Sequence, residues 1–359
     1  MRVVIRVDAS TVIGSGHVMR CLTLAERLRD ERQAEVIFIS RDLPGNMIAL
    51  VRARGFAVAE LPRVEVNPDL AGYAAWLTVS QEQDARDTLG VLAGVASPVD
   101  WLVVDSYALD ERWEKLLRPQ VGHIFVVDDL ANRKHDCEVL LDQNFHLSKE
   151  NRYAGLVPQA CRLLVGVRYA LLRKEFYAAR RQLRERKGEL RQIPVFYGGS
   201  DRTDETSKAI RALLTLRPQL AAEFQAVVVV GKSNVRREAV RQLCDRAAWL
   251  EYHCQVDNVA ELMAASDLML SAGGTTTWER CYLGLPALVT AVADNQLQGC
   301  ADCAEAGFQI YLGCASEVTE QTLIAAITRL TREQLQAQSE AGFKIMAGND
   351  YTSGPYLTI

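Results

Sequence analysis

The sequence predicts an α/β protein with two doubly wound domains, each a parallel sheet covered by helices. Runs of β-branched and apolar residues alternate with segments of helical periodicity along the chain, and this alternation is typical of parallel sheets. Glycine-rich and acidic clusters directly follow several of these runs, as expected where strands end at a ligand site. With 359 residues, 49% of them hydrophobic, the chain is long enough for two domains.

The expected strands fall into two sets, separated by a segment without strand rhythm. That segment, residues 151–180, ends in a clear helical pattern and holds the expected domain boundary. We expect the first domain over residues 1–170 and the second over residues 171–359, with the last helix packing back on the first domain. The charged run at residues 180–191 is interpreted as a solvated helix followed by a connection. The strand-like runs are "VVIRV", "AEVIFIS", "FAVAEL", "DWLVVD", "HIFVVDD" and "EVLLDQ", then "IPVFYGG", "AVVVVG", "WLEYH", "DLMLSAGG", "PALVT" and "FQIYLG".

A glycine loop that ends in a histidine precedes the first helix. "MRVVIRVD" predicts a buried strand and "VMRCLTLAERL" has helical periodicity, so Gly14, Gly16 and His17 lie between strand and helix. Free N–H groups give a helix N-terminus partial positive charge, which disfavours the imidazolium form of a first-turn histidine. A neutral imidazole can take up a proton, so His17 is a candidate general base. The alternative is an ordinary turn followed by a solvent-facing polar residue.

Two loops in the second half combine glycines with hydroxyl groups and predict a phosphate site. One follows "IPVFY"; the other follows "DLMLSA" and precedes a helix expected to start near Thr275. Backbone N–H groups and hydroxyls at a helix start bind phosphate oxygens. One turn into that helix, Glu279 can accept two ribose hydroxyls. Plain turn glycines are the alternative. The loop residues concerned are Gly198, Gly199, Ser200, Ser271, Gly273, Gly274, Thr275 and Thr276.

Composition argues against several classes of protein. The formal net charge of −4 gives no electrostatic reason to expect a nucleic-acid partner. No signal peptide or long apolar segment is apparent, so we expect a soluble, cytoplasmic protein without a membrane partner. Nine cysteines in apolar contexts suit reduced thiols.

Three familiar motifs are incomplete. Cys300 and Cys303 form a C-x-x-C without a second pair, and we interpret them as buried side chains of a helix. "AVVVVGKSN" resembles the end of a P-loop, but Ala226 stands where the motif needs its first glycine. No Asp-x-Asp pair occurs. We therefore expect neither a metal nor a cofactor.

The motifs resemble two groups of known enzymes. "SAGGTTTWERCYLGLPALV" followed by "DNQ" is similar to the UDP-binding half of GT-B-fold enzymes, nearest to the transferase that adds N-acetylglucosamine in peptidoglycan lipid synthesis. "IGSGHVMRCLTLAE", "VVDSYALDERWE", "VVDDLANRKHDCEVLLDQN" and "RYALLRKEF" resemble the UDP-2,4-diacetamido-2,4,6-trideoxy-β-L-altropyranose hydrolases of pseudaminic acid biosynthesis. The resemblance runs from residue 1 to about residue 310. The chain departs from it by extra residues near 60–95 and by an atypical tail over residues 347–359.

This resemblance implies a GT-B fold, with two Rossmann-like domains facing each other across a cleft, and a site at that cleft. The family's catalytic histidine falls on His17, and its UDP contacts fall on the two loops and on Glu279. Asn295 and Gln296 then face the sugar. The strand-end residues Asp8, Asp105, Asp128 and Asp129 are expected to line the same cleft; strand-end capping is the alternative for Asp128 and Asp129. Further substrate contacts are expected from Gly14, Gly16, Arg20, Asp105 and Tyr107.

The implied reaction is hydrolysis of a UDP-sugar at its anomeric carbon with inversion. His17 would take a proton from water while UDP leaves from the opposite face. The expected partner is therefore a small UDP-sugar, and we expect a monomer or weak oligomer. A glycosyltransferase with the same donor, a UDP-sugar epimerase and a non-catalytic nucleotide-sugar binding protein are the alternatives. Turnover of a UDP-sugar without an acceptor, followed as free UDP and released sugar, excludes the binding protein and tests for the hydrolase.

Overall fold

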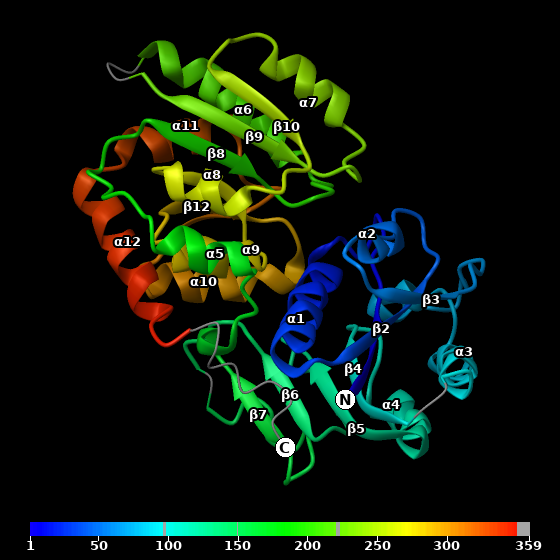
Figure 1. The fold of residues 1–359 in the computed structure, drawn as a ribbon. Helices are drawn as coiled ribbons and strands as arrows, with labels where there is room; N and C mark the ends of the chain where they lie inside the picture. Colours follow the sequence, from blue (N-terminus) through cyan, green and yellow to red (C-terminus); the bar gives the residue numbers. More distant parts are fainter. Residues whose placement is uncertain (96–97, 149, 220–222, 350–359) are drawn as a thin grey trace. The chain divides into compact units, whose positions relative to one another are not determined.

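The chain forms two compact units in the computed structural model (Figure 1). The structure describes residues 1–349 except 96–97, 149 and 220–222. Among these, the first unit holds residues 1–144 and 148–171, and the second holds residues 145–147 and 172–349. Most of the atypical tail, residues 350–359, lies outside the described residues.

The first unit is built on a parallel sheet with the strand order β3-β2-β1-β4-β5-β6-β7. The direction of strand succession reverses between β1 and β4, and ligands of doubly wound sheets bind at the carboxyl ends of the strands beside such a point. β1 is central and almost fully buried. The strands are β1 (Arg2–Val7), β2 (Glu35–Arg41), β3 (Ala57–Leu61), β4 (Val99–Asp105), β5 (Val121–Val127), β6 (Val139–Asp142) and β7 (Arg162–Val165).

Helix α1 (Gly16–Arg32) follows β1 and packs its apolar face into the core of this sheet. That face includes Val18, Leu24 and Leu28, which are almost completely buried, as their helical spacing predicts. The remaining helical segments of this unit are α2 (Ile48–Ala53), η1 (Gly72–Leu77), α3 (Gln81–Ala93), α4 (Glu111–Leu117), η2 (Arg118–Gln120) and η3 (Val167–Tyr169).

The second unit has a sheet of the same kind, with the strand order β10-β9-β8-β11-β12-β13. Its reversal lies between β8 and β11, so the two glycine loops follow the two strands at that point. The valines of β9 lie inside the sheet, which confirms that the P-loop-like run is a strand. The strands are β8 (Gln192–Phe196), β9 (Gln225–Val230), β10 (Leu250–Cys254), β11 (Met269–Ala272), β12 (Ala287–Ala291) and β13 (Ile310–Cys314).

The helices of the second unit cover this sheet, and the last of them, α12 (Arg332–Ile345), packs on α9 (Thr276–Tyr282). Gly284, at φ +57°, ends the α9 turn, and the Phe343 ring of α12 occupies the space where a Cβ would stand. The packing of α12 on the first domain stays a prediction. The other helices are α5 (Lys174–Arg180), α6 (Glu205–Leu216), η4 (Arg217–Gln219), α7 (Arg237–Cys244), α8 (Val259–Ala265), η5 (Asp294–Gln296), α10 (Leu297–Glu305) and α11 (Glu320–Arg329).

Two details of the sequence interpretation were wrong. The segment 151–180, expected to lack strands, contains β7, a short edge strand that pairs with β6. In the charged run 180–191, the helix ends at Arg180 instead of continuing. Arg184 pairs with Asp267, and Arg186 donates to the carbonyls of Met263, Ser266, Leu283 and Gly284. These guanidinium groups satisfy orphan carbonyls near the ends of α8 and α9, so the run is bound to the second unit and not simply solvated.

The cysteine interpretation was right. Cys300 and Cys303 lie on α10 and are almost fully buried, and both are free thiols. Burial raises the pKa of the Cys300 thiol to about 12, so this thiol stays protonated at neutral pH.

Candidate active site

His17 stands in the first turn of α1, where the glycine loop returns from the end of β1. Gly14 has φ +83°, a conformation that favours glycine. The Ser10 hydroxyl accepts from the N–H groups of Val12 and Ile13 and fixes the start of the loop. A Cβ at Gly14 or at Gly16 would meet open space. The loop therefore leaves room beside its backbone for a ligand, at the start of a helix.

Asp105, the last residue of β4, holds the His17 ring. The Nδ1 atom of His17 lies 2.6 Å from Oδ1 of Asp105. Because a carboxylate only accepts, Nδ1 carries the proton and donates it to Asp105. The ring's Nε2 atom is then an acceptor, and no described residue forms a hydrogen bond with it. An aspartate that orients a histidine in this way is the arrangement of an activated base.

Arg20, one turn along α1, keeps Asp105 ionised. Its guanidinium donates two hydrogen bonds to Asp105, from Nε and from Nη2, both at 2.7 Å. Burial opposes ionisation of Asp105, but Arg20 and then His17 outweigh it and hold the pKa of that carboxyl well below its usual range. Asp105 is thus a fixed negative charge that can stabilise an imidazolium on His17.

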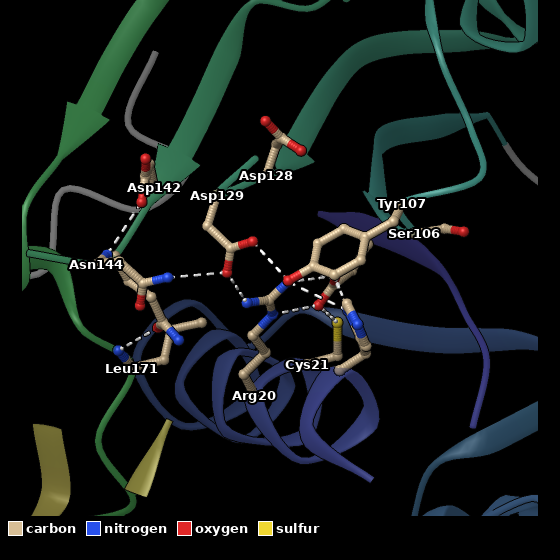
Figure 2. A network of polar contacts seen from close by, with 12 residues as sticks. Arg20, Cys21, Ser106, Tyr107, Asp128, Asp129, Asp142, Asn144 and Leu171 are labelled. Atoms are coloured by element: carbon tan, nitrogen blue, oxygen red, sulfur yellow. Dashed lines mark hydrogen bonds and ion pairs between the residues drawn. The ribbon is translucent and has the colours of Figure 1, made fainter. Parts of the chain in front are cut away.

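Asp129 extends this network on the other side of Arg20 (Figure 2). It accepts from Nη1 of Arg20 at 3.1 Å, from the Tyr107 hydroxyl at 2.5 Å and from the Asn144 amide at 3.0 Å. Burial, followed by the Asp129 charge, raises the pKa of Tyr107 well above its ordinary value, so its hydroxyl stays protonated. The Tyr107 ring packs edge-on against His17, with the ring centroids 4.7 Å apart.

The other two strand-end aspartates have structural partners. Asp8 pairs with Arg6 at 2.7 Å and accepts from the Arg41 backbone N–H. Asp128 is fully buried, pairs with Arg133 and accepts from the Ala131 N–H. The side chains of Asp8 and Asp128 therefore hold neighbouring segments at the strand ends. Asp105 and Asp129 instead join His17 and Arg20.

Two further aromatic residues near His17, Trp76 and Tyr73, were not expected from the sequence. Trp76, on η1, lies 6.0 Å from the His17 ring and 5.5 Å from the Tyr107 ring, measured between centroids. Tyr73 lies 4.8 Å from Trp76. η1 lies within residues 60–95, where the chain was expected to exceed the family it resembles. Two aromatics at i and i+3 in "YAAW" were the available signal, because this spacing places both on one face of a 3-10 turn.

The first glycine loop of the second unit follows β8. Gly198 has φ +90° and open space where a Cβ would point. The Gly199 carbonyl accepts from Gly231 N–H and from the Ser233 hydroxyl, which fixes the loop against the end of β9. Asp201 accepts from the N–H groups of Glu205 and Thr206 and caps α6. The first two N–H groups of α6 are therefore occupied, and the open space in this loop lies at Gly198.

The second loop joins β11 to α9. A Cβ at Gly273 would collide with Sγ of Cys300, whereas Gly274 faces open space. Thr275 is the N-cap of α9, but its side chain makes no capping hydrogen bond. Ser271 lies deeper, with a buried hydroxyl that has no partner among the described residues. Thr276 is partly buried at the first position of α9.

One carboxylate oxygen of Glu279 already has a hydrogen-bond partner within the protein. Its Oε1 accepts from Nε of Arg173 at 2.8 Å, an ion pair that the sequence did not predict. Further along the same sheet edge, Gln296 accepts from the Val292 N–H and is held to its own turn, while Asn295 is exposed on η5. The predicted residues thus form two groups, one in each unit: Gly14, Gly16, His17, Arg20, Asp105 and Tyr107, and the loop residues with Glu279, Asn295 and Gln296.

Comparison with known proteins defines the class of fold. Residues 194–348 match the glycosyltransferase family 28 C-terminal domain. The Acinetobacter baumannii MurG structure aligns with a TM-score of 0.61 at 16% identity, over 96% of this chain and 94% of that one. The spinosyn rhamnosyltransferase SpnG aligns with a TM-score of 0.63 at 18% identity, over 97% of this chain and 96% of that one. The chain has the GT-B fold, as its sequence predicted.

Comparison with curated proteins confirms the particular resemblance. The chain is 24% identical to the UDP-2,4-diacetamido-2,4,6-trideoxy-beta-L-altropyranose hydrolase of Campylobacter jejuni, over 86% of this chain and 98% of that protein. It is 25% identical to the uncharacterized protein MJ1062 of Methanocaldococcus jannaschii over 83% of its own length. It spans only 57% of that longer relative.

Proposed function

We propose that this protein hydrolyses a UDP-linked 2,4-diacetamido-2,4,6-trideoxyhexose, the β-L-altropyranose, at C1, in pseudaminic acid biosynthesis. The observation that carries the proposal is the His17–Asp105 pair, in which Nε2 of His17 has no hydrogen-bond partner among the described residues. The glycine loop that leads to His17 has open space at Gly14 and Gly16. Its similarity to the Campylobacter hydrolase covers both halves of the chain, and the family 28 match supports nucleotide-sugar chemistry in the second.

In the proposed reaction, His17 activates a water molecule. The water oxygen attacks C1 of the sugar while Nε2 of His17 takes one of its protons. The bond from C1 to the diphosphate oxygen breaks, and UDP leaves with the electron pair. Asp105 accepts the Nδ1 proton's hydrogen bond throughout and stabilises the imidazolium as it forms. Attack opposite the leaving group inverts the configuration at C1.

The second unit supplies the proposed UDP site. Gly198–Ser200 and Gly274–Thr276 offer backbone N–H groups and hydroxyls that can neutralise the diphosphate as negative charge grows on it. UDP is already a good leaving group. With its charge stabilised in this way, its departure requires no strong general acid.

The test is a panel of UDP-sugars offered to the purified protein without an acceptor. We expect free UDP and free sugar from the diacetamido-trideoxy substrate, and NMR of the first-formed sugar should show inversion before mutarotation. No UDP release from any donor would contradict the proposal. Retention of configuration at C1 would show that a carboxylate, and not His17, is the main catalytic group.

A glycosyltransferase is the second candidate, because the second unit matches a glycosyltransferase domain. Such an enzyme transfers the sugar to an alcohol in place of water. It would release UDP slowly from the donor alone and quickly once an acceptor is added, whereas the hydrolase rate should not depend on an acceptor.

We expect turnover to persist in EDTA. The sequence has no Asp-x-Asp pair, and within residues 1–349, gaps aside, no group of three or more His, Cys, Asp or Glu residues could hold a metal ion. Initial rates with and without chelator check this. A loss of activity that only magnesium or manganese restores would show that a metal bridges the diphosphate.

We expect Glu279→Ala to weaken UDP binding by about 1–3 kcal/mol, the cost of losing charge-assisted hydrogen bonds to the ribose. Calorimetric titration with UDP measures this. Glu175→Ala is the matched control, because Glu175 pairs with the same Arg173 at 3.1 Å but lies outside the loops. Equal UDP affinity in the parent and the Glu279 variant would move the ribose site elsewhere.

A further inference from the structure

The aromatic group of Tyr73, Trp76 and Tyr107 lies against one side of the His17 ring. Trp76 contacts both His17 and Tyr107, and Tyr73 contacts Tyr107 with the ring centroids 5.1 Å apart. Tyr73 and Trp76 remain partly exposed, while Tyr107 is almost fully buried. Apolar ring surface is therefore available to a ligand beside the imidazole ring of the proposed base.

The η1 segment holds these rings in fixed positions. Leu77 and Val79, on either side of Thr78, are buried in the hydrophobic core of the first unit. Thr78 ends the turn at φ +64°, and its hydroxyl bonds to the Leu77 carbonyl. Because the turn is anchored on both sides of Thr78, Trp76 is presented as a rigid surface and not as part of a loose loop.

The faces of these rings offer no hydrogen-bond partner to a hexose hydroxyl, so they favour contact with the apolar groups of a sugar. Each buried methyl group gains free energy from leaving water, and aromatic faces provide large rigid area for such contacts. A fully hydroxylated hexose would instead leave hydroxyls without hydrogen-bond partners against these rings.

We propose that Trp76, supported by Tyr73, is a specificity residue that contacts the methyl groups of the sugar. This inference rests on the proposed function and deepens it. The methyl groups come from two sources, C6 of the 6-deoxy sugar and the acetamido substituents. Both are absent from UDP-glucose, whereas UDP-N-acetylglucosamine has an acetamido methyl and no 6-deoxy methyl.

The test compares the parent with Trp76→Ala and Trp76→Phe. We expect Trp76→Ala to lower kcat/KM for the diacetamido-trideoxy donor by about 10–100-fold, chiefly through KM, and Trp76→Phe to retain most of the parent value. Affinity for UDP alone should not change. Trp249→Ala is the matched control, since Trp249 is also partly buried but packs on Phe224 in the second unit; its kinetics should equal those of the parent.

Two donors separate the sources of the methyl contact. If Trp76→Ala also weakens UDP-N-acetylglucosamine binding, measured calorimetrically, the acetamido methyl is the contact; if only the trideoxy donor is affected, it is C6. Equal kcat/KM and equal donor affinity in Trp76→Ala and the parent would overturn the proposal. If the parent hydrolyses nothing, the proposed function fails, but the donor affinities relative to UDP still decide whether Trp76 contacts the sugar.

Discussion

Replacement of His17 with asparagine should lower the hydrolysis rate by about 10²–10⁴, the usual contribution of a general base. The amide fills nearly the same space and can still donate to Asp105, but it cannot take up a proton at neutral pH. Initial rates of UDP release at neutral pH measure this effect.

Two controls keep this result specific. UDP affinity should be nearly unchanged in His17→Asn, because the proposed UDP contacts lie in the second unit. His123→Asn changes another histidine of the first unit, which stacks on Trp101 near the amino ends of β4 and β5, whereas Asp105 ends β4; this variant should keep the parent rate. If His17→Asn hydrolyses the donor at near the parent rate, His17 is only the first polar residue of a helix, and the glycine loop serves the turn.

The sequence predicted the two sheets well for a physical reason. Strands buried on both faces are apolar along most of their length, so runs such as "VVIRV", with one buried arginine, and "AVVVV" are easily recognised. β7 has the same parallel pairing but lies at the edge, with two of its residues exposed. Its four residues lack the long apolar run, and only the neighbouring strand determines their conformation.

The candidate site was predictable as far as it depends on local sequence. Gly14, Gly16 and His17 are adjacent, and a turn between strand and helix fixes their arrangement. The partner of His17 is 88 residues away. From the sequence alone, Asp105 was expected as a substrate contact and was not paired with His17. The pairing arises because β4 neighbours β1 in this topology, so that Asp105 ends beside the start of α1.

Contacts made by irregular segments could not be predicted in this way. η1 approaches His17 through packing of Leu77 and Val79 into the core, and no sheet register fixes that approach. Arg173, the partner of Glu279, stands just before α5 and 106 residues from it. The "YAAW" spacing indicates which residues of η1 share a face, but not what that face contacts, and nothing in the sequence marks Arg173 as the partner of Glu279. Each contact depends on where a loop packs against the sheet.

Asp105→Asn should reduce the rate on the order of 10²–10⁴, because the amide removes the charge that stabilises imidazolium and can bind the wrong tautomer. If the amide donates to Nδ1, the proton moves to Nε2 and His17 can no longer accept one from water. Rates of UDP release, divided by the folded fraction, give this result.

Stability measurements separate this role from simple loss of a buried charge. The depressed pKa of Asp105 contributes stability that is fully present above its unfolded value near 4 and is lost as the pH falls further toward the folded value. The gap in unfolding free energy between parent and Asp105→Asn should therefore be largest at neutral pH and shrink below about pH 4. Asp84→Asn is the matched control, since Asp84 is fully buried against Arg6 and Arg41 but does not contact His17. It should lose stability and keep the parent rate per folded molecule; if Asp105→Asn also kept that rate, the carboxylate would serve only to neutralise Arg20, and His17 would act without an orienting partner.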